Sequence, residues 1–223
     1  MPRSEAHAMN LRLVEIIQSQ GTLEPISGLE RCFLEVVNEI LTTDRLRGLH
    51  GLMHWADWLS NCDNRTIDTF STLESFLQHR VRNVGYQAMR GMLPYVMDMD
   101  ISDADEKTIW DFHDAAGRSV CLTNDYLSWA KELRQAEKGY GHIMNTVTLL
   151  MRVEGLEMDD AHARVRELAM EYERRALRHR DRLLRSNLSE HIKRYLHALC
   201  WMVGGTVLWS ATCPRYNSEY LEK

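Results

Sequence analysis

The chain has 223 residues, of which 44% belong to the hydrophobic set and 26% are charged, with only 4 Pro and 12 Gly. This composition is that of a globular domain and excludes a disordered tail. A domain of this length buries roughly 70% of its unfolded surface, so we expect residues 1–223 to form a single domain. The net charge of −5 speaks against a general nucleic-acid binder.

The cysteines and the hydropathy pattern exclude three further classes of protein. The five Cys are odd in number, scattered and without a CxxC pair, so neither a disulfide framework nor a zinc site is indicated. Residues 1–26 contain no continuous apolar run, and no stretch reaches 18 uninterrupted apolar residues, which predicts no membrane span. We therefore expect a soluble, cytoplasmic protein.

Apolar residues at steps of three and four predict helices along most of the chain. The first follows Ser27, a residue suited to cap a helix. Helices are predicted over about 27–43, 66–92, 103–138, 142–154, 159–185 and 188–212. Breaks are predicted at Pro94, Gly139-Tyr140-Gly141, Gly155 and Ser186-Asn187. No strand pattern is present, so the sequence predicts an all-α helical bundle, in which ligand sites are built from side chains on facing helices.

A basic stretch over 174–185 is the feature closest to a nucleic-acid patch. Its arginines alternate with Leu177, Leu183 and Leu184, which is typical of a solvated helix face. We expect no nucleic-acid partner.

Residues 124–132, with the sequence NDYLSWAKE, place three oxygen-bearing side chains on one helical stripe. Asn124, Ser128 and Glu132 stand at i, i+4 and i+8, within roughly 80° of one another on a helix. An amide oxygen, a hydroxyl and a carboxylate are hard donors that suit Mg²⁺, which takes further ligands from water and substrate phosphate. Lys131 is either a point charge for the same phosphate or an ordinary solvated lysine.

This nonapeptide resembles the second metal-binding motif of class I terpene synthases, N-D/S-x-x-S/T-x-x-x-E, in the form found in fungal terpene cyclases. A second resemblance lies earlier in the chain, where residues 76–85 read FLQHRVRNVG and Arg80 stands 44 residues ahead of Asn124. They are similar to the family segment Y-L-x-x-R-x-x-D-x-G, which implies that Arg80 senses the substrate pyrophosphate and Gly85 breaks the helix. Asn83 replaces the family's linker Asp, so it keeps hydrogen bonding and loses the charge.

A third segment, residues 209–216 with the sequence WSATCPRY, resembles the W-S-x-x-x-P-R-Y ending of the fungal enzymes. The resemblance implies that Arg215 and Tyr216 close over the pyrophosphate. Pro214 is expected to end the last helix, which would leave this pair on a mobile segment. All three segments fall within residues 70–217, where the resemblance is strongest.

The resemblance implies a reaction in which Mg²⁺ and the basic side chains draw the diphosphate off a linear prenyl diphosphate. The allylic cation then cyclises in an apolar cavity whose aromatic faces stabilise it. The fungal form of the motifs favours a geranylgeranyl or geranylfarnesyl substrate over a farnesyl one. For most aromatic candidates ordinary core packing is the favoured alternative. These candidates are Phe76, Tyr86, Tyr95, Trp129, Trp201 and Trp209.

The family's aspartate-rich D-D-x-x-D motif is absent ahead of Arg80, and we read the acidic residues over 98–106 as a loop in which Ser102 caps the next helix. We therefore expect a domain that is incomplete at its N-terminus. The alternative function is a truncated cyclase-like protein without catalysis of its own. A homodimer or a complementing N-terminal partner would then cover the exposed cavity wall.

Overall fold

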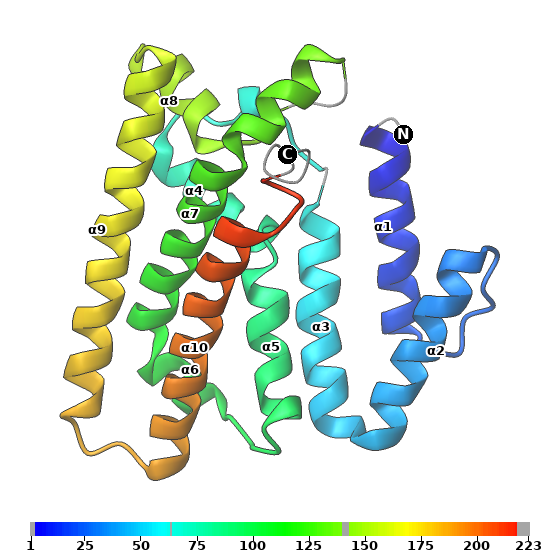
Figure 1. The fold of residues 1–223 in the computed structure, drawn as a ribbon. Helices are drawn as coiled ribbons and strands as arrows, with labels where there is room; N and C mark the ends of the chain where they lie inside the picture. The colour runs from blue at the N-terminus through cyan, green and yellow to red at the C-terminus, as the bar shows by residue number, and fades with distance from the viewer. Residues whose placement is uncertain (1–2, 63, 140–142, 218–223) are drawn as a thin grey trace.

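The structure is a computed structural model that describes residues 3–62, 64–139 and 143–217, and within these ranges it is helical and contains no strand (Figure 1). The prediction of an all-α bundle is confirmed. Residues 140–142, which hold part of the predicted break and the start of the helix predicted over 142–154, lie outside the described residues. The helices are α1 (Arg3–Gln18), α2 (Gly28–Thr43), α3 (Arg45–Asn61), α4 (Leu73–Asn83), α5 (Tyr86–Val96), α6 (Asp103–Thr108), α7 (Trp110–Glu137), α8 (Thr146–Glu154), α9 (Met158–Leu184) and α10 (Glu190–Thr212), with a 3-10 turn at Ile67–Thr69.

Helix α2 begins where the sequence predicts it. The Ser27 hydroxyl accepts a hydrogen bond from the backbone N–H of Glu30 at 3.1 Å, which satisfies one of the free donors of the first turn. Ser102 caps α6 in the same way, in a reciprocal capping box with Asp105.

Two predicted helices are each divided in the structure. The one over 66–92 is wrong as a single element, because Gly85 adopts a left-handed φ of 88° and separates α4 from α5. The one over 103–138 is split into α6 and α7 at Ile109.

The break predicted at Pro94 is also wrong. Pro94 lies inside α5, which continues to Val96. The carbonyls around it remain satisfied, since Met97 N–H donates to Leu93 O at 2.9 Å and Met99 N–H donates to Pro94 O at 3.0 Å. A proline in the last turn therefore leaves this helix end intact.

Helices α1 and α3 have no counterpart among the predicted elements. The buried face of α3 contains Gly48 and Gly51 beside Leu52 and Ala56, so small residues weaken its apolar pattern. They serve close approaches to two helices: a Cβ added at Gly51 would lie 2.4 Å from Met92 Sδ on α5, and one added at Gly48 would lie 2.7 Å from Ile40 Cγ2 on α2. Tertiary packing therefore decides the helical state of this segment.

The helices pack side by side around two clusters of buried apolar side chains (Figure 1). The larger cluster joins α4 to α10 and includes Phe76, Leu122 and Tyr195, while the smaller joins α1 to α3 around Ile16 and Val37. Helix α3 packs along α5, and α10 packs against both α5 and α7. Among the described residues no helix is long and apolar enough to cross a membrane.

Candidate active site

The three segments singled out in the sequence meet at one cavity of about 740 Å³ between α3, α4, α5, α7, α10 and the turn that follows α10. Ser128 is fully buried beside this cavity. The other predicted site residues all line it: Arg80, Asn124, Lys131, Glu132, Arg215 and Tyr216.

The oxygen stripe of α7 is formed as the spacing predicts. Ser128 Oγ donates to Glu132 Oε1 at 2.6 Å, and Asn145 Nδ2 donates to Glu132 Oε2 at 3.1 Å. Burial, together with the negative charge of Asp125, raises the pKa of Glu132 above its usual range. A carboxylate in this environment is stabilised by a nearby cation.

The stripe fits a hard divalent cation by its donor set. It offers an amide oxygen, a hydroxyl and a carboxylate, and within the described ranges no ion pair joins Glu132 to a lysine or arginine. The same ranges hold no group of three His, Cys, Asp or Glu side chains that could bind a metal. By their donor types Asn124, Ser128 and Glu132 are candidate ligands, because amide, hydroxyl and carboxylate oxygens suit Mg²⁺ better than a softer metal.

Arg80 is held in a buried network at the edge of this stripe. Its Nε and Nη2 donate to Asp125 Oδ1 at 3.0 and 2.6 Å, and its Nη2 also donates to Asn124 Oδ1 at 3.1 Å. Burial alone would lower the pKa of Arg80, but the charge of Asp125 outweighs it and raises that pKa. Arg80 Nη1 donates to Asn83 Oδ1 at 2.6 Å, so the hydrogen bond expected of Asn83 is present.

Asp125 is a structural member of the site that sequence reasoning missed. The carboxylate is fully buried, and its second oxygen accepts hydrogen bonds from Thr146 N–H at 2.8 Å and Thr146 Oγ1 at 2.6 Å. It therefore ties Arg80 on α4 and the start of α8 to α7. In the sequence Asp125 fills the D/S position of the motif that contains Asn124, but its partners become visible only in the fold.

The segment after α10 closes the polar end of the cavity. Asn124 Nδ2 donates to the Tyr216 hydroxyl at 2.9 Å. Lys131 Nζ lies 5.7 Å and Arg215 Cζ 5.9 Å from the centre of the Tyr216 ring. Burial and the charge of Arg215 lower the pKa of Lys131. Lys131 is thus half-buried in the cavity wall, and α10 ends at Thr212, just ahead of the proline as expected.

The cavity is also lined by aromatic and thioether side chains. Of the aromatic candidates from the sequence, only Trp209 lines it, while Phe76 and Trp129 are buried in the core and Trp201 is 82% exposed. Tyr86 is also a core residue, and Tyr95 does not line the cavity. Core packing is therefore the correct interpretation for three of the six candidates: Phe76, Tyr86 and Trp129.

Two further aromatic lining residues, Trp55 and Trp58, were missed. Both belong to α3, and their rings meet edge to face at 5.2 Å. Their spacing of three residues placed them on one helical face, a signal that could have been read had α3 been predicted. The Trp58 indole N–H donates to Asn83 O at 3.1 Å, which couples the aromatic wall to the α4 terminus.

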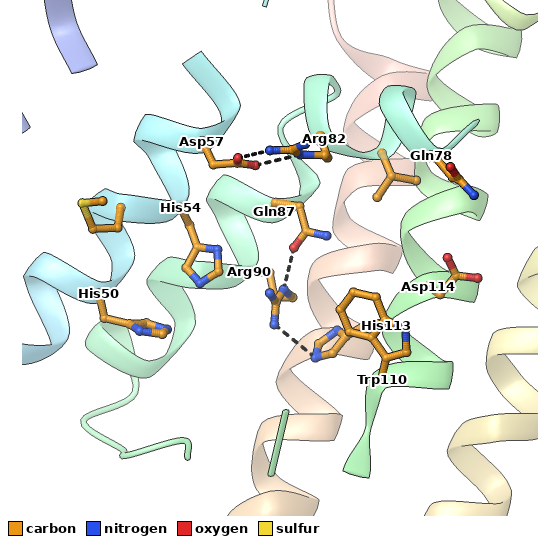
Figure 2. A pocket seen from close by; sticks show the side chains of 12 residues that line it. His50, His54, Asp57, Gln78, Arg82, Gln87, Arg90, Trp110, His113 and Asp114 are labelled. Atoms are coloured by element: carbon orange, nitrogen blue, oxygen red, sulfur yellow. Dashed lines mark hydrogen bonds and ion pairs between the residues drawn. The ribbon is translucent and has the colours of Figure 1, made fainter. Parts of the chain in front are cut away.

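A second cavity, of about 550 Å³, lies among α3, α4, α5 and α7 and contains none of the predicted site residues. Figure 2 shows Asp57 paired with Arg82, and Arg90 in contact with Gln87 and His113. Because the predicted site residues line the first cavity and none lines this one, the candidate active site is the first cavity.

A helical bundle with an oxygen-donor stripe, three cations and an aromatic wall around one cavity has the architecture of a class I terpene synthase. The chain matches the family model described as terpene synthase family 2, C-terminal metal binding, over residues 3–175. It belongs to this family. The resemblance drawn from the three motifs is thereby confirmed.

Curated fungal relatives agree with the family match. The chain is 32% identical over 194 residues to the sesterterpene synthase btcA of Colletotrichum orbiculare, covering 85% of this chain and 27% of that one. It is 29% identical over 185 residues to the terpene cyclase ATR13 of Stachybotrys chlorohalonatus, covering 80% of this chain and 48% of that one. The chain thus spans about a quarter to a half of the length of these relatives.

Solved structures share the fold. Aristolochene synthase from Penicillium roqueforti aligns with a TM-score of 0.71 at 18% identity, covering 95% of this chain and 71% of that one. Germacradien-4-ol synthase from Streptomyces citricolor aligns with a TM-score of 0.73 at 18% identity, covering 94% and 69%. At this identity the comparison establishes the all-α fold alone.

Proposed function

We propose that the chain is a terpene cyclase domain that ionises a linear prenyl diphosphate in a Mg²⁺-dependent reaction and cyclises the resulting cation. The observation that carries the proposal is the convergence of three motif segments on one cavity that is lined by both cationic and aromatic side chains. Family membership supports the enzyme class.

At the polar end, each cation has a distinct part. Asp125 fixes the position of Arg80, which binds the diphosphate from α4. Lys131 and Arg215 bind the diphosphate from α7 and from the terminal turn. The Tyr216 hydroxyl accepts its hydrogen bond from Asn124, so its own proton is free to donate to a phosphate oxygen. Mg²⁺ held by the α7 stripe would neutralise charge on the departing diphosphate.

Trp55, Trp58 and Trp209 line the same cavity and present aromatic rings to the hydrocarbon chain. Their faces attract the allylic cation after the diphosphate leaves, and their bulk excludes water from it. We propose a geranylgeranyl or geranylfarnesyl chain as the substrate, in preference to farnesyl. The support is that a similar fungal protein is a sesterterpene synthase.

We also propose that residues 1–223 act as one domain, because the packing of α3 on α5 joins the two apolar clusters.

Trp201 and Leu208 on α10 are 82% and 66% exposed, which supports cover of this surface by a second copy or a complementing partner. Light scattering of purified protein tests cover by a second copy: a strictly monomeric species would contradict it.

Substitution of the stripe tests the metal assignment. Asn124→Ala and Glu132→Ala each remove one oxygen ligand, so we expect each to abolish Mg²⁺-dependent pyrophosphate release from geranylgeranyl diphosphate. Glu137→Ala, which removes an exposed carboxylate from the same helix, should retain full activity.

Persistent activity in the two stripe variants would contradict the ligand set. Absence of turnover in the unaltered chain with farnesyl, geranylgeranyl and geranylfarnesyl diphosphate would instead favour the alternative, a cyclase-like chain without catalysis of its own.

A further inference from the structure

Ser210, on the last turn of α10, has a buried hydroxyl without a hydrogen-bond partner. The residue is 1% exposed and lines the cavity of the active site. Within the described ranges its Oγ neither donates nor accepts a hydrogen bond. Buried hydroxyls in folded proteins are nearly always paired, so an unpaired one in a cavity wall points to a partner supplied by the cavity's ligand.

The other hydroxyls near this end of α10 behave differently. Thr206 Oγ1 donates to Met202 O at 2.9 Å, and Thr212 Oγ1 donates to Leu208 O at 2.7 Å, each to the carbonyl four residues earlier. Ser210 could satisfy its proton in the same way and does not. Its hydroxyl is therefore left free for a group outside its own helix.

Ser210 belongs to the polar end of the cavity. Arg215 and Tyr216 follow it by five and six residues and line the same cavity. The Ser210 carbonyl accepts a hydrogen bond from Asn217 Nδ2 at 3.5 Å, which holds the terminal turn close to this part of α10. The hydroxyl thus lies in the part of the wall that also carries a guanidinium and a phenol.

We infer that Ser210 Oγ donates a hydrogen bond to a phosphate oxygen of the bound prenyl diphosphate, which makes Ser210 a substrate-binding residue beside Arg215 and Tyr216. This inference rests on the proposed function. A diphosphate presents several anionic oxygens. Among the residues that the structure describes, the Ser210 hydroxyl has no competing acceptor, so it can rotate and donate its proton to any of these oxygens.

Calorimetric titration of the full chain with inorganic pyrophosphate in the presence of Mg²⁺ tests this inference. Ser210→Ala should weaken pyrophosphate binding about tenfold or more, as expected for a lost hydrogen bond to a charged acceptor.

Two matched controls separate the causes. Thr206→Val removes a cavity-lining hydroxyl that is already paired, and Thr148→Val removes a buried unpaired hydroxyl outside this cavity. Both should bind pyrophosphate within about twofold of the unaltered chain, since neither loses a bond to the ligand.

Three results would contradict the inference. The first is unchanged pyrophosphate affinity in Ser210→Ala while the unaltered chain binds. The second is lost prenyl diphosphate turnover with unchanged pyrophosphate affinity, which would assign the hydroxyl to the hydrocarbon or to a water. The third is a lowered melting temperature of Ser210→Ala, which would reveal a structural partner. Failure of the unaltered chain itself to bind pyrophosphate with Mg²⁺ would instead contradict the proposed function.

Discussion

Arg80 and Asp125 form the buried ion pair that organises the polar end of the cavity. Asp125 is fully buried and accepts hydrogen bonds from both Arg80 and Thr146. A buried pair of this kind adds little net stability, but removal of one partner leaves an uncompensated charge in a dry environment. We therefore regard Asp125 as a positioning residue that orients the Arg80 guanidinium.

Asp125→Ala should lower the free energy of unfolding by about 3–5 kcal/mol, measured by urea denaturation, because it leaves Arg80 buried and unpaired. Asp57→Ala is the control, since the ion pair of Asp57 with Arg82 is exposed and should contribute at most about 1 kcal/mol. Equal losses of unfolding free energy in the two variants would contradict the claim that the buried ion pair is the more costly one to break.

Two histidines, the buried His79 and the partly buried His54, should determine how stability changes at acid pH. Burial lowers the pKa of His54 and of His79 to about 4, from an ordinary value of 6.5. Between these values the unfolded chain binds protons that the folded chain does not, so stability should fall as the pH drops from about 6.5 to 4.

Urea denaturation at pH 7, 5.5 and 4.5 measures this slope. His79→Phe, which retains an aromatic ring beside Phe70 and cannot titrate, should flatten it. An unchanged slope in this variant would show that His79 is already free to protonate in the folded state.

At the scale of elements, regular apolar spacing was sufficient to predict helices α2, α9 and α10. It also predicted α7, apart from the residue at which α7 starts. Apolar spacing failed to predict the segments whose conformation depends on tertiary packing rather than on the hydrophobic pattern of the sequence. Helix α3 approaches α5 through Gly51 and Gly91, and both glycines dilute the hydrophobic signal. The division of the segment over 66–92 required the left-handed Gly85, which periodicity does not detect but the motif did indicate.

Gly85→Ala tests the helix break. Its φ of 88° disfavours any side chain, although the nearest atoms, in Trp58, would lie an ordinary 3.8 Å from the new Cβ. The substitution should therefore lower the free energy of unfolding by about 1–2 kcal/mol through backbone strain.

Gly155→Ala is a matched control, since Gly155 has a φ of 68° and open space around it at the end of α8. Both variants should lose similar stability in urea denaturation, but only Gly85→Ala should also reduce turnover, because Gly85 lines the cavity. Equal turnover in the two variants would contradict a role for the break in the site.

At the scale of the whole molecule, the sequence predicted the residue types of the site better than their surroundings. Arg80 and Asn124 stand 44 residues apart and Asn124 and Tyr216 stand 92 apart, yet each pair is joined by a hydrogen bond. Helical spacing predicted the α7 stripe, and resemblance supplied the other two segments. The indole wall of Trp55 and Trp58 depends on how α3 packs, which no local pattern encodes.

Product analysis of the unaltered chain tests the central claim most directly, namely that the convergent segments form one site for a prenyl diphosphate. Purified protein is incubated with geranylgeranyl diphosphate, with Mg²⁺ or with a chelator, and pyrophosphate release and extracted hydrocarbons are measured together. We predict pyrophosphate and a cyclic terpene in equal amounts with Mg²⁺, and neither with the chelator. Absence of both products with Mg²⁺, for this substrate and its geranylfarnesyl homologue, would contradict the claim.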